Sequence, residues 1–142
     1  MALQKILVPI DQSDGARRAV QVATELAQLS TDVHLDIVHV VPIPVLSNQQ
    51  TESFQEILDM MIEDGKELLS HAADDASAVV DQIDTMLLTG TDPALELMKL
   101  VEQRSYDLVV IGNRGLSGLK EYTGSVSLKL MHGTQTSILI AR

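Results

Sequence analysis

The chain has 142 residues, with 20 acidic and 10 basic side chains and a formal net charge of −10. This excess of negative charge repels nucleic-acid backbones and anionic membranes at long range, so we expect neither as a partner. The chain contains no cysteine, which excludes disulfides, thiolate nucleophiles and cysteine-ligated zinc. Neither a membrane-span pattern nor a signal-peptide pattern is present, and we expect one cytoplasmic domain over residues 1–142.

The first segments of the chain predict a strand followed by a helix. Residues 4–8 form a short apolar run rich in β-branched side chains, and a polar turn follows it. Small and apolar residues then recur at helical spacing over residues 16–27, with Ser13 or Asp14 available as the N-cap. This order of elements is the beginning of a strand–helix–strand unit.

The next segments repeat the same alternation. Residues 33–41 predict a strand, and the apolar face of residues 54–72 predicts a long helix. Residues 42–51 lie between them and contain two prolines and several polar residues, so we expect a mobile loop there. Residues 82–88 predict a third strand.

The last third of the chain continues the pattern to its end. Thr91 or Asp92 would cap a third helix that begins with Pro93. Residues 108–111 predict a strand covered on both faces, 125–131 a helix and 137–141 a final strand. Strict alternation of strands and helices predicts an α/β fold with a parallel, doubly wound sheet.

Two loops at the carboxyl ends of strands are candidates for a ligand site, because open α/β sheets bind ligands at that edge. One covers residues 9–14, and the other, residues 112–118, contains three glycines and Arg114, which would cap a phosphate. Gly124 and Ser125 stand where the next helix is predicted to begin, with free N–H groups for the same anion. Alternatively, these glycines serve only turns and close packing, and Gly124–Ser125 is only an N-cap.

Four stretches of this sequence resemble the universal stress protein family, and the resemblance covers nearly the whole chain. They are Ile6-Leu7-Val8-Pro9-Ile10-Asp11, His39-Val40, Gly90-Thr91-Asp92-Pro93 and the run from Tyr106 to Gly115. The resemblance implies a three-layer, five-stranded fold of the adenine nucleotide alpha hydrolase type, with strand order 3-2-1-4-5. It also implies a role in stress response.

The nucleotide-binding branch of that family has a glycine pattern that this chain nearly matches. The pattern is Gly, two residues, Gly, nine residues, Gly, then Ser or Thr. Gly112 and Gly115 fit the pattern, but only eight residues separate Gly115 from Gly124. One residue fewer shifts the start of the next helix by up to about 3.5 Å, the reach of one residue, unless the loop glycines absorb the change.

The resemblance implies a site for ATP or AMP. It places Asp11 near the ribose and a phosphate-bound Mg²⁺ ion, and the backbone of Val40 against the adenine. The remaining residues that we predict to contact the nucleotide are Pro9, Ile111, Gly112, Arg114, Gly115, Gly124, Ser125 and Val126.

Other chemistries have little support in the sequence. The histidines have no metal-ligand spacing, so we interpret them as structural, with the strand residue His39 a hydrogen-bonded core residue; they are His34, His39, His71 and His132. Residues 88–90, which end the third strand, lack the phosphoacceptor aspartate of a receiver domain. The sequence also lacks a P-loop motif.

Three functions remain open from the sequence. The first is a regulatory module that binds an adenine nucleotide, and the second is an interaction protein whose shortened loop no longer accepts one. The third is a slow ATP hydrolase or a self-phosphorylating enzyme, for which Asp11 with Mg²⁺ and Arg114 are the only candidate groups and no residue is marked as a dedicated catalyst. In each case we expect a homodimer through the apolar edge strand at residues 137–141.

Overall fold

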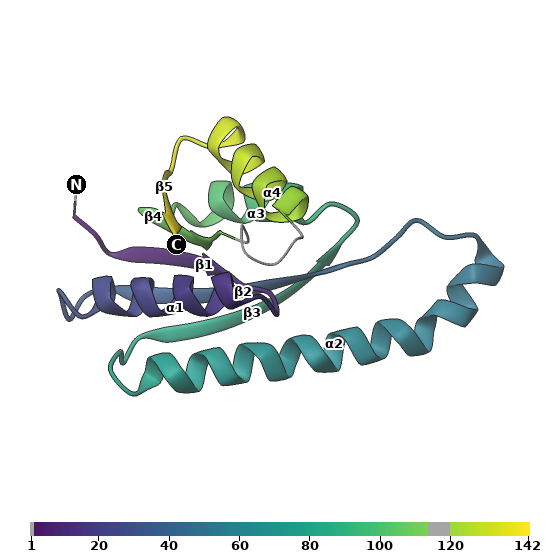
Figure 1. Cartoon of the computed structure of the whole chain (residues 1–142), viewed down its shortest axis with the longest axis horizontal. Helices are drawn as coiled ribbons and strands as arrows, with labels where there is room; N and C mark the ends of the chain where they lie inside the picture. The colour runs from purple at the N-terminus through teal and green to yellow at the C-terminus, as the bar shows by residue number, and fades with distance from the viewer. Residues whose placement is uncertain (1, 114–119) are drawn as a thin grey trace.

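The computed structural model describes residues 2–113 and 120–142, and within them all side chains except those of residues 48–52 and 120–125. Five strands alternate with four helices along these residues (Figure 1). In chain order the elements are β1 (Lys5–Pro9), α1 (Asp14–Ala27), β2 (His34–Pro42), α2 (Asn48–Ser77), β3 (Ile83–Gly90), α3 (Pro93–Arg104), β4 (Leu108–Gly112), α4 (Lys120–Gly133) and β5 (Ser137–Ala141).

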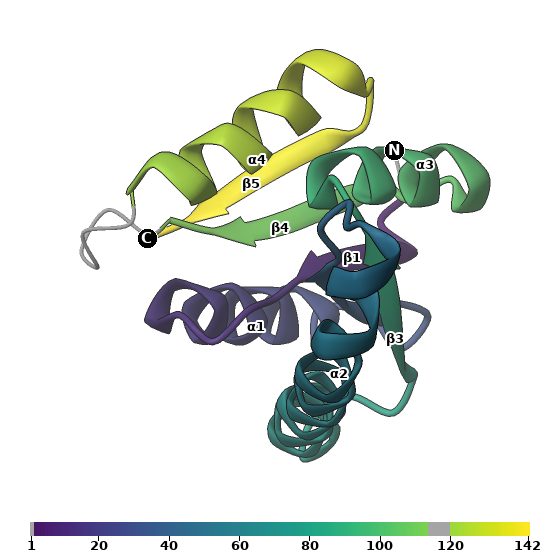
Figure 2. The same ribbon diagram turned by 90° about the vertical axis from the view of Figure 1, so that its right-hand side faces the viewer.

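The strands form one parallel sheet in the order β3-β2-β1-β4-β5, which confirms the predicted doubly wound α/β fold. Helices α1 and α2 lie on one side of the sheet, and α3 and α4 lie on the other (Figure 2). The chain begins in the middle of the sheet, moves outward through β2 to β3, and then crosses β1 to continue at β4. Strand order therefore reverses between β1 and β4, where such folds hold ligands.

Alternating residues of the central strands build the two halves of the core. Ile6 and Val8 of β1 belong to an apolar cluster with α1 and α2, whereas Leu7 belongs to a second cluster with α3 and α4. All three side chains are fully buried. A strand that is covered on both faces needs apolar residues at every position, which explains the continuous apolar run seen in the sequence.

Local polar groups begin two of the helices as predicted. Ser13 is the N-cap of α1, and its Oγ accepts a hydrogen bond from the Ala16 N–H at 3.2 Å. Asp92 is the N-cap of α3, and Pro93 is the first residue of that helix. Both caps satisfy N–H groups that lack a partner inside the helix, and both put a helix N-terminus at the carboxyl edge of the sheet.

Two predicted boundaries are wrong, and both helices begin earlier than expected. Helix α2 begins at Asn48, so the loop before it covers residues 43–47 and not the whole of 42–51. The residues after position 47 include Gln and Glu, which favour helices, and the prolines lie before them. Helix α4 begins at Lys120 rather than Ser125, because Lys, Glu and Tyr precede Gly124 and one glycine costs a helix only about 1 kcal/mol.

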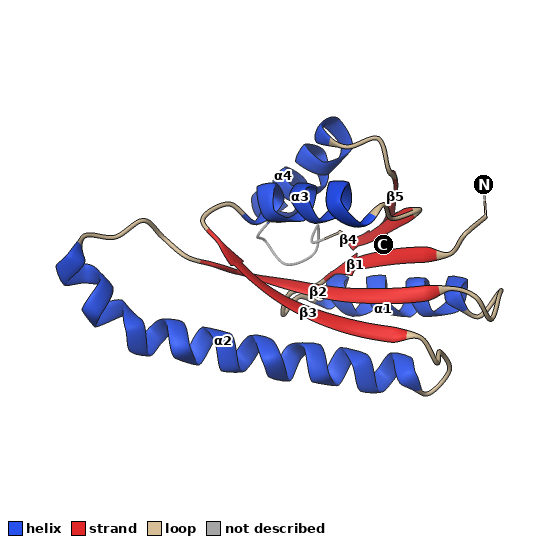
Figure 3. Ribbon diagram, turned by 180° about the vertical axis from the view of Figure 1, so that it is seen from behind, coloured by secondary structure: helices blue, strands red, loops and turns tan. Residues whose placement is uncertain are grey.

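Strands β2 and β3 run side by side over almost their whole lengths (Figure 3). Their register pairs Leu35 with Ile83 at one end and Pro42 with Gly90 at the other. Helix α2 connects them and extends past the sheet (Figures 1 and 3). Among the described residues, no helix has the length and apolarity that crossing a bilayer requires.

Candidate functional site

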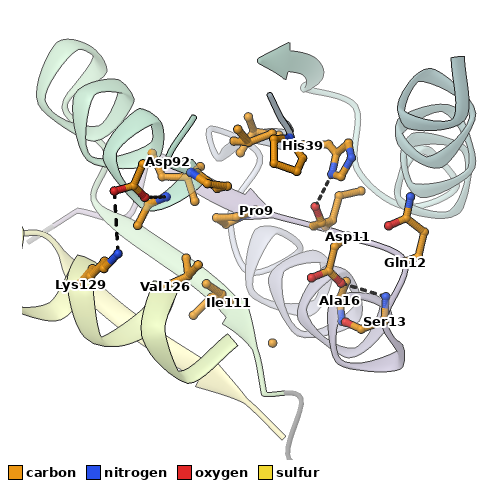
Figure 4. A pocket seen from close by; sticks show the side chains of 18 of the residues that line it. Pro9, Asp11, Gln12, Ser13, Ala16, His39, Asp92, Ile111, Val126 and Lys129 are labelled. Carbon is orange, nitrogen blue, oxygen red and sulfur yellow. Dashed lines mark hydrogen bonds and ion pairs between the residues drawn. The ribbon is translucent and has the colours of Figure 1, made fainter. Parts of the chain in front are cut away.

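A cavity of about 590 Å³ opens at the carboxyl edge of the sheet, between the N-termini of α1 and α3 and one side of α4 (Figure 4). The loops after β1 and β3, the second half of β2, the end of β4, the first turns of α1 and α3 and two residues of α4 contribute to its wall. The lining residues are Pro9, Ile10, Asp11, Gln12, Ser13, Ala16, Val38, His39, Val40, Pro42, Thr91, Asp92, Pro93, Ala94, Leu97, Ile111, Gly112, Val126 and Lys129.

The cavity brings together most of the residues predicted from the sequence to contact a nucleotide. Six of them line it, although they come from four separate segments of the chain: Pro9, Asp11, Val40, Ile111, Gly112 and Val126. Arg114 and Gly115 lie outside the described residues. The candidate site thus lies where strand order reverses, as the fold predicts.

The position of Gly124 and Ser125 differs from the prediction that they begin a helix. They are the fifth and sixth residues of α4, which begins at Lys120. In an α-helix, the N–H groups at these positions are paired with carbonyls one turn earlier, and only the first turn leaves donors free. The free N–H groups of this helix therefore belong to its first turn, and not to Gly124 and Ser125.

The N-terminus of α1 supplies one polar wall of the cavity. Asp11 lies in the loop after β1, and its Oδ1 accepts a hydrogen bond from the backbone N–H of Ser13 at 2.8 Å. Ser13 in turn caps α1, which starts with Asp14. The bond holds the Asp11 carboxylate beside a helix N-terminus, whose partial positive charge favours anions.

The opposite wall contains an ion pair that sequence analysis missed. Asp92 Oδ1 accepts hydrogen bonds from the N–H groups of Ala94 and Leu95, at 3.1 and 3.4 Å, and Asp92 Oδ2 lies 3.8 Å from Lys129 Nζ. Figure 4 shows this pair joining α3 to α4 at the side of the cavity away from Asp11. The cap itself was predictable from Asp92-Pro93, but no local signal connects Asp92 with a lysine 37 positions later.

Apolar side chains form the interior of the cavity between these two walls. Val38, Val40 and Leu97 are buried and belong to one core cluster. His39 is 8% exposed, and its Nδ1 lies 2.8 Å from the Ile10 carbonyl oxygen. A carbonyl can only accept, so Nδ1 carries the proton, and the prediction that His39 is a hydrogen-bonded core residue is confirmed.

Gly112 has a packing role that needs no ligand. A Cβ atom built on this residue would lie 2.2 Å from the carbonyl oxygen of Gly15 in α1. Gly15 is just as restricted, because its own Cβ would lie 2.8 Å from the Asn113 oxygen. The two glycines let the first turn of α1 approach the end of β4, where Gly112 also lines the cavity.

A family model described as the universal stress protein family matches residues 2–142. The chain belongs to that family. Among curated relatives, a universal stress protein of Bacillus subtilis is 33% identical to it, over 97% of this chain and 98% of the relative. This universal stress protein also has the fold of the UspA protein of Lactobacillus plantarum, with a TM-score of 0.87, 22% identity and full coverage of both chains.

Some solved structures similar to this universal stress protein are complexes with adenine nucleotides. A universal stress protein in complex with cAMP is 27% identical to it, with a TM-score of 0.70 and coverage of 100% and 98%. A protein of Archaeoglobus fulgidus in complex with dAMP is 20% identical, with a TM-score of 0.71 and coverage of 99% and 98%. An Arabidopsis thaliana protein with AMP bound is 19% identical, with a TM-score of 0.73 and coverage of 97% and 90%.

Proposed function

We propose that this universal stress protein is a regulatory module that binds an adenine nucleotide, ATP or AMP, in the cavity at the carboxyl edge of its sheet. One observation carries the proposal: a single cavity combines two helix N-termini with an apolar interior, at the point where strand order reverses. Its volume of about 590 Å³ lies within the range of small-molecule sites, about 300–1,000 Å³. The adenine-nucleotide complexes of related folds support the same ligand class.

The apolar interior of the cavity and its polar wall at α1 suit the two ends of a nucleotide, the base and the phosphates. Apolar side chains at the end of β2, among them Val38 and Val40, offer a surface for the base. The N-terminus of α1, beyond Ser13, offers positive potential for phosphate. A nucleotide that spans the cavity would therefore have its base near β2 and its phosphates near α1 and the end of β4.

Asp11 fits the role of a ligand for a nucleotide-bound Mg²⁺ ion. Magnesium is usually held by one or two carboxylates together with phosphate oxygens and water. Asp11 supplies one carboxylate at the edge of the cavity, and the Ser13 N–H orients it. When bound, the ion would offset the repulsion between this carboxylate and the phosphates. Homodimerisation and a cytoplasmic location stay predictions.

Calorimetric titration with ATP and AMP, in the presence and absence of Mg²⁺, tests the proposal. We expect saturable binding by the wild type and at least tenfold weaker binding of Mg–ATP by Asp11→Ala. Asp14→Ala is the matched control, because Asp14 is exposed, lies three residues later and does not line the cavity. Equal losses in the two variants would point to general electrostatics, and no binding by the wild type would refute the proposal.

A second candidate function has its own supporting observation. The start of α4 at Lys120 pairs the N–H groups of Gly124 and Ser125 inside the helix, which favours an interaction protein that does not bind nucleotide. Native mass spectrometry separates the two candidates. Retained nucleotide, or an adduct with added ATP, supports the first, and the absence of both supports the second. Slow hydrolysis requires phosphate release that Asp11→Ala abolishes at ATP concentrations that still saturate the variant.

A further inference from the structure

A cluster of His34, Asp36 and Asp84 lies near the amino ends of β2 and β3, whereas the cavity opens at the carboxyl ends of the strands. His34 and Asp36 are two residues apart near the start of β2, so they share one face of the strand, while the cavity is lined by Val38 and later residues of β2. The Nε2 atom of His34 lies 2.9 Å from Asp36 Oδ1 and 2.9 Å from Asp84 Oδ2. One nitrogen and two oxygens, from three side chains on two strands, lie within 4.8 Å of one another.

The register of the sheet makes this cluster electrostatically unusual. Asp36 and Asp84 are direct partners across the β2–β3 ladder. Like charges directly opposite each other destabilise a sheet, and burial strengthens their repulsion. The Asp36 side chain is only 3% exposed, so water screens it poorly. A positive charge between the two carboxylates would therefore offset their repulsion and stabilise the sheet.

The neighbouring basic side chains, His34 and Lys5, neutralise the two carboxylates only in part. His34 Nε2 carries at most one hydrogen, yet it is equally close to both carboxylates. Lys5 is the register partner of His34 on β1, but its Nζ donates to the Arg104 carbonyl at 2.7 Å and lies 5.2 Å from the centroid of the Tyr106 ring. That lysine is directed to the end of α3 and not between the two aspartates.

Tyr106 holds the buried carboxylate in a fixed orientation. Its hydroxyl donates to Asp36 Oδ2 at 2.5 Å, and the other oxygen, Oδ1, is the one that lies 2.9 Å from His34 Nε2. Burial, together with the neighbouring Asp36, raises the pKa of Tyr106 above the usual value for tyrosine, so the phenol remains a donor at neutral pH. Metal-binding carboxylates commonly have such a hydrogen-bonding partner behind them.

We propose that His34, Asp36 and Asp84 form a binding site for a divalent transition-metal ion, with Zn²⁺ as the best-fitting ion. Imidazole and carboxylate together suit Zn²⁺, whereas Mg²⁺ and Ca²⁺ prefer oxygen ligands alone. Tetrahedral zinc with bonds of about 2.0–2.2 Å spaces its ligand atoms about 3.4 Å apart. The 2.9 Å separations would therefore open by about half an ångström on binding.

The exposure of Asp84 and His34 allows this adjustment and gives an ion access to the site. The Asp84 side chain is 70% exposed and His34 is 30% exposed, so Asp84 moves with little packing cost and the ion enters from its side. Three protein ligands leave the fourth position of zinc to water, as in sites that are open to solvent. The ion would stabilise the β2–β3 ladder by neutralising its opposed carboxylates. This site does not depend on the proposed nucleotide.

Metal titration of the untagged, nucleotide-free protein tests the proposal. We expect Zn²⁺ to bind in a 1:1 ratio and to raise the melting temperature, and Co²⁺ to give visible d–d absorption bands. His34→Gln and Asp84→Asn should each weaken Zn²⁺ binding at least tenfold. His132→Gln is the matched control, because His132 is an exposed histidine on α4, remote from β2 in sequence. It should bind Zn²⁺ like the wild type.

Asp84→Asn and Tyr106→Phe separate the loss of a metal ligand from a failure to fold. Asp84 is the exposed member of the cluster, so Asp84→Asn should fold even where a change at the buried Asp36 does not. Tyr106→Phe keeps all three ligands and should weaken Zn²⁺ binding by about tenfold, the usual size of the effect when such a supporting bond is lost. Absence of saturable Zn²⁺ binding by the wild type would overturn the proposal. Binding that is unchanged in both His34→Gln and Asp84→Asn would overturn it as well.

Discussion

Replacing Gly112 by alanine tests whether the contact between β4 and α1 sets the geometry of the cavity. The new Cβ would lie 2.2 Å from the Gly15 oxygen and 2.4 Å from the Gly15 carbonyl carbon, against the 3.0 Å that such contacts require. Restoring the oxygen contact alone moves α1 away from β4 by about 0.8 Å. Because the obstacle is backbone, no side chain can rotate away, and we place the steric cost near the upper end of the usual overpacking range, about 3 kcal/mol.

A smaller effect on the unfolded state opposes this cost. Alanine has fewer unfolded conformations than glycine, which stabilises the protein by about 0.4–1 kcal/mol. We therefore expect Gly112→Ala to lower the free energy of unfolding by about 2 kcal/mol, and the melting temperature by about 6–8 °C for a chain of this length. Urea denaturation followed by circular dichroism measures the first quantity, and calorimetry measures the second.

Gly90→Ala is the matched control for this experiment. Its Cβ would lie 2.5 Å from Cγ of Glu96, a side chain that can rotate away, so we expect a change within about 0.5 kcal/mol. Equal unfolding free energies for wild type, Gly112→Ala and Gly90→Ala would refute the reasoning, because α1 would then have yielded to the methyl group without cost. If the nucleotide proposal holds, Gly112→Ala should also weaken binding, since it displaces one wall of the cavity.

Two further predictions concern the edges of the sheet. Because the pKa of Tyr106 is raised in the folded protein, its stabilising effect is complete below the unfolded tyrosine pKa of about 10 and declines as pH rises past that value. Urea denaturation between about pH 9 and 11 should therefore show the stability difference between wild type and Tyr106→Phe shrinking as pH rises; a constant difference would contradict the assignment. On β5, Ile140 is 39% exposed at the free edge of the sheet. Ile140→Lys should therefore convert the expected homodimer to a monomer, which size-exclusion chromatography with light scattering measures. A monomeric wild type would refute the dimer itself.

Gly112 belongs both to the family's nucleotide-binding glycine pattern and to the packing contact between β4 and α1. Gly112 matches the family's nucleotide-binding pattern, yet its contact with Gly15 explains a glycine there without any ligand. The same residue also lines the cavity. A loss of binding in a Gly112 variant therefore has to be judged against its loss of stability, and for this reason Asp11→Ala and its control Asp14→Ala carry the functional test.

The sequence by itself determined the elements of the fold, their order and the caps of α1 and α3. The five strand boundaries agree with their predictions within two residues, because apolar runs and N-cap side chains act on their own neighbours in the chain. The sequence predicted a helix boundary wrongly where neighbouring residues gave opposite indications. At the start of α4, Gly124 suggested a boundary that the helix-forming residues before it overrode.

Only the tertiary structure decided which distant residues meet. The ion pair of Asp92 with Lys129, the contact of Gly112 with Gly15 and the alignment of Asp36 with Asp84 all depend on strand order and register. Strand register is a property of two segments together, and shifting the β2–β3 register by one residue would place Asp36 and Asp84 on opposite faces of the sheet. No local pattern at His34 or Asp84 indicates that an imidazole and two carboxylates will share one position in space.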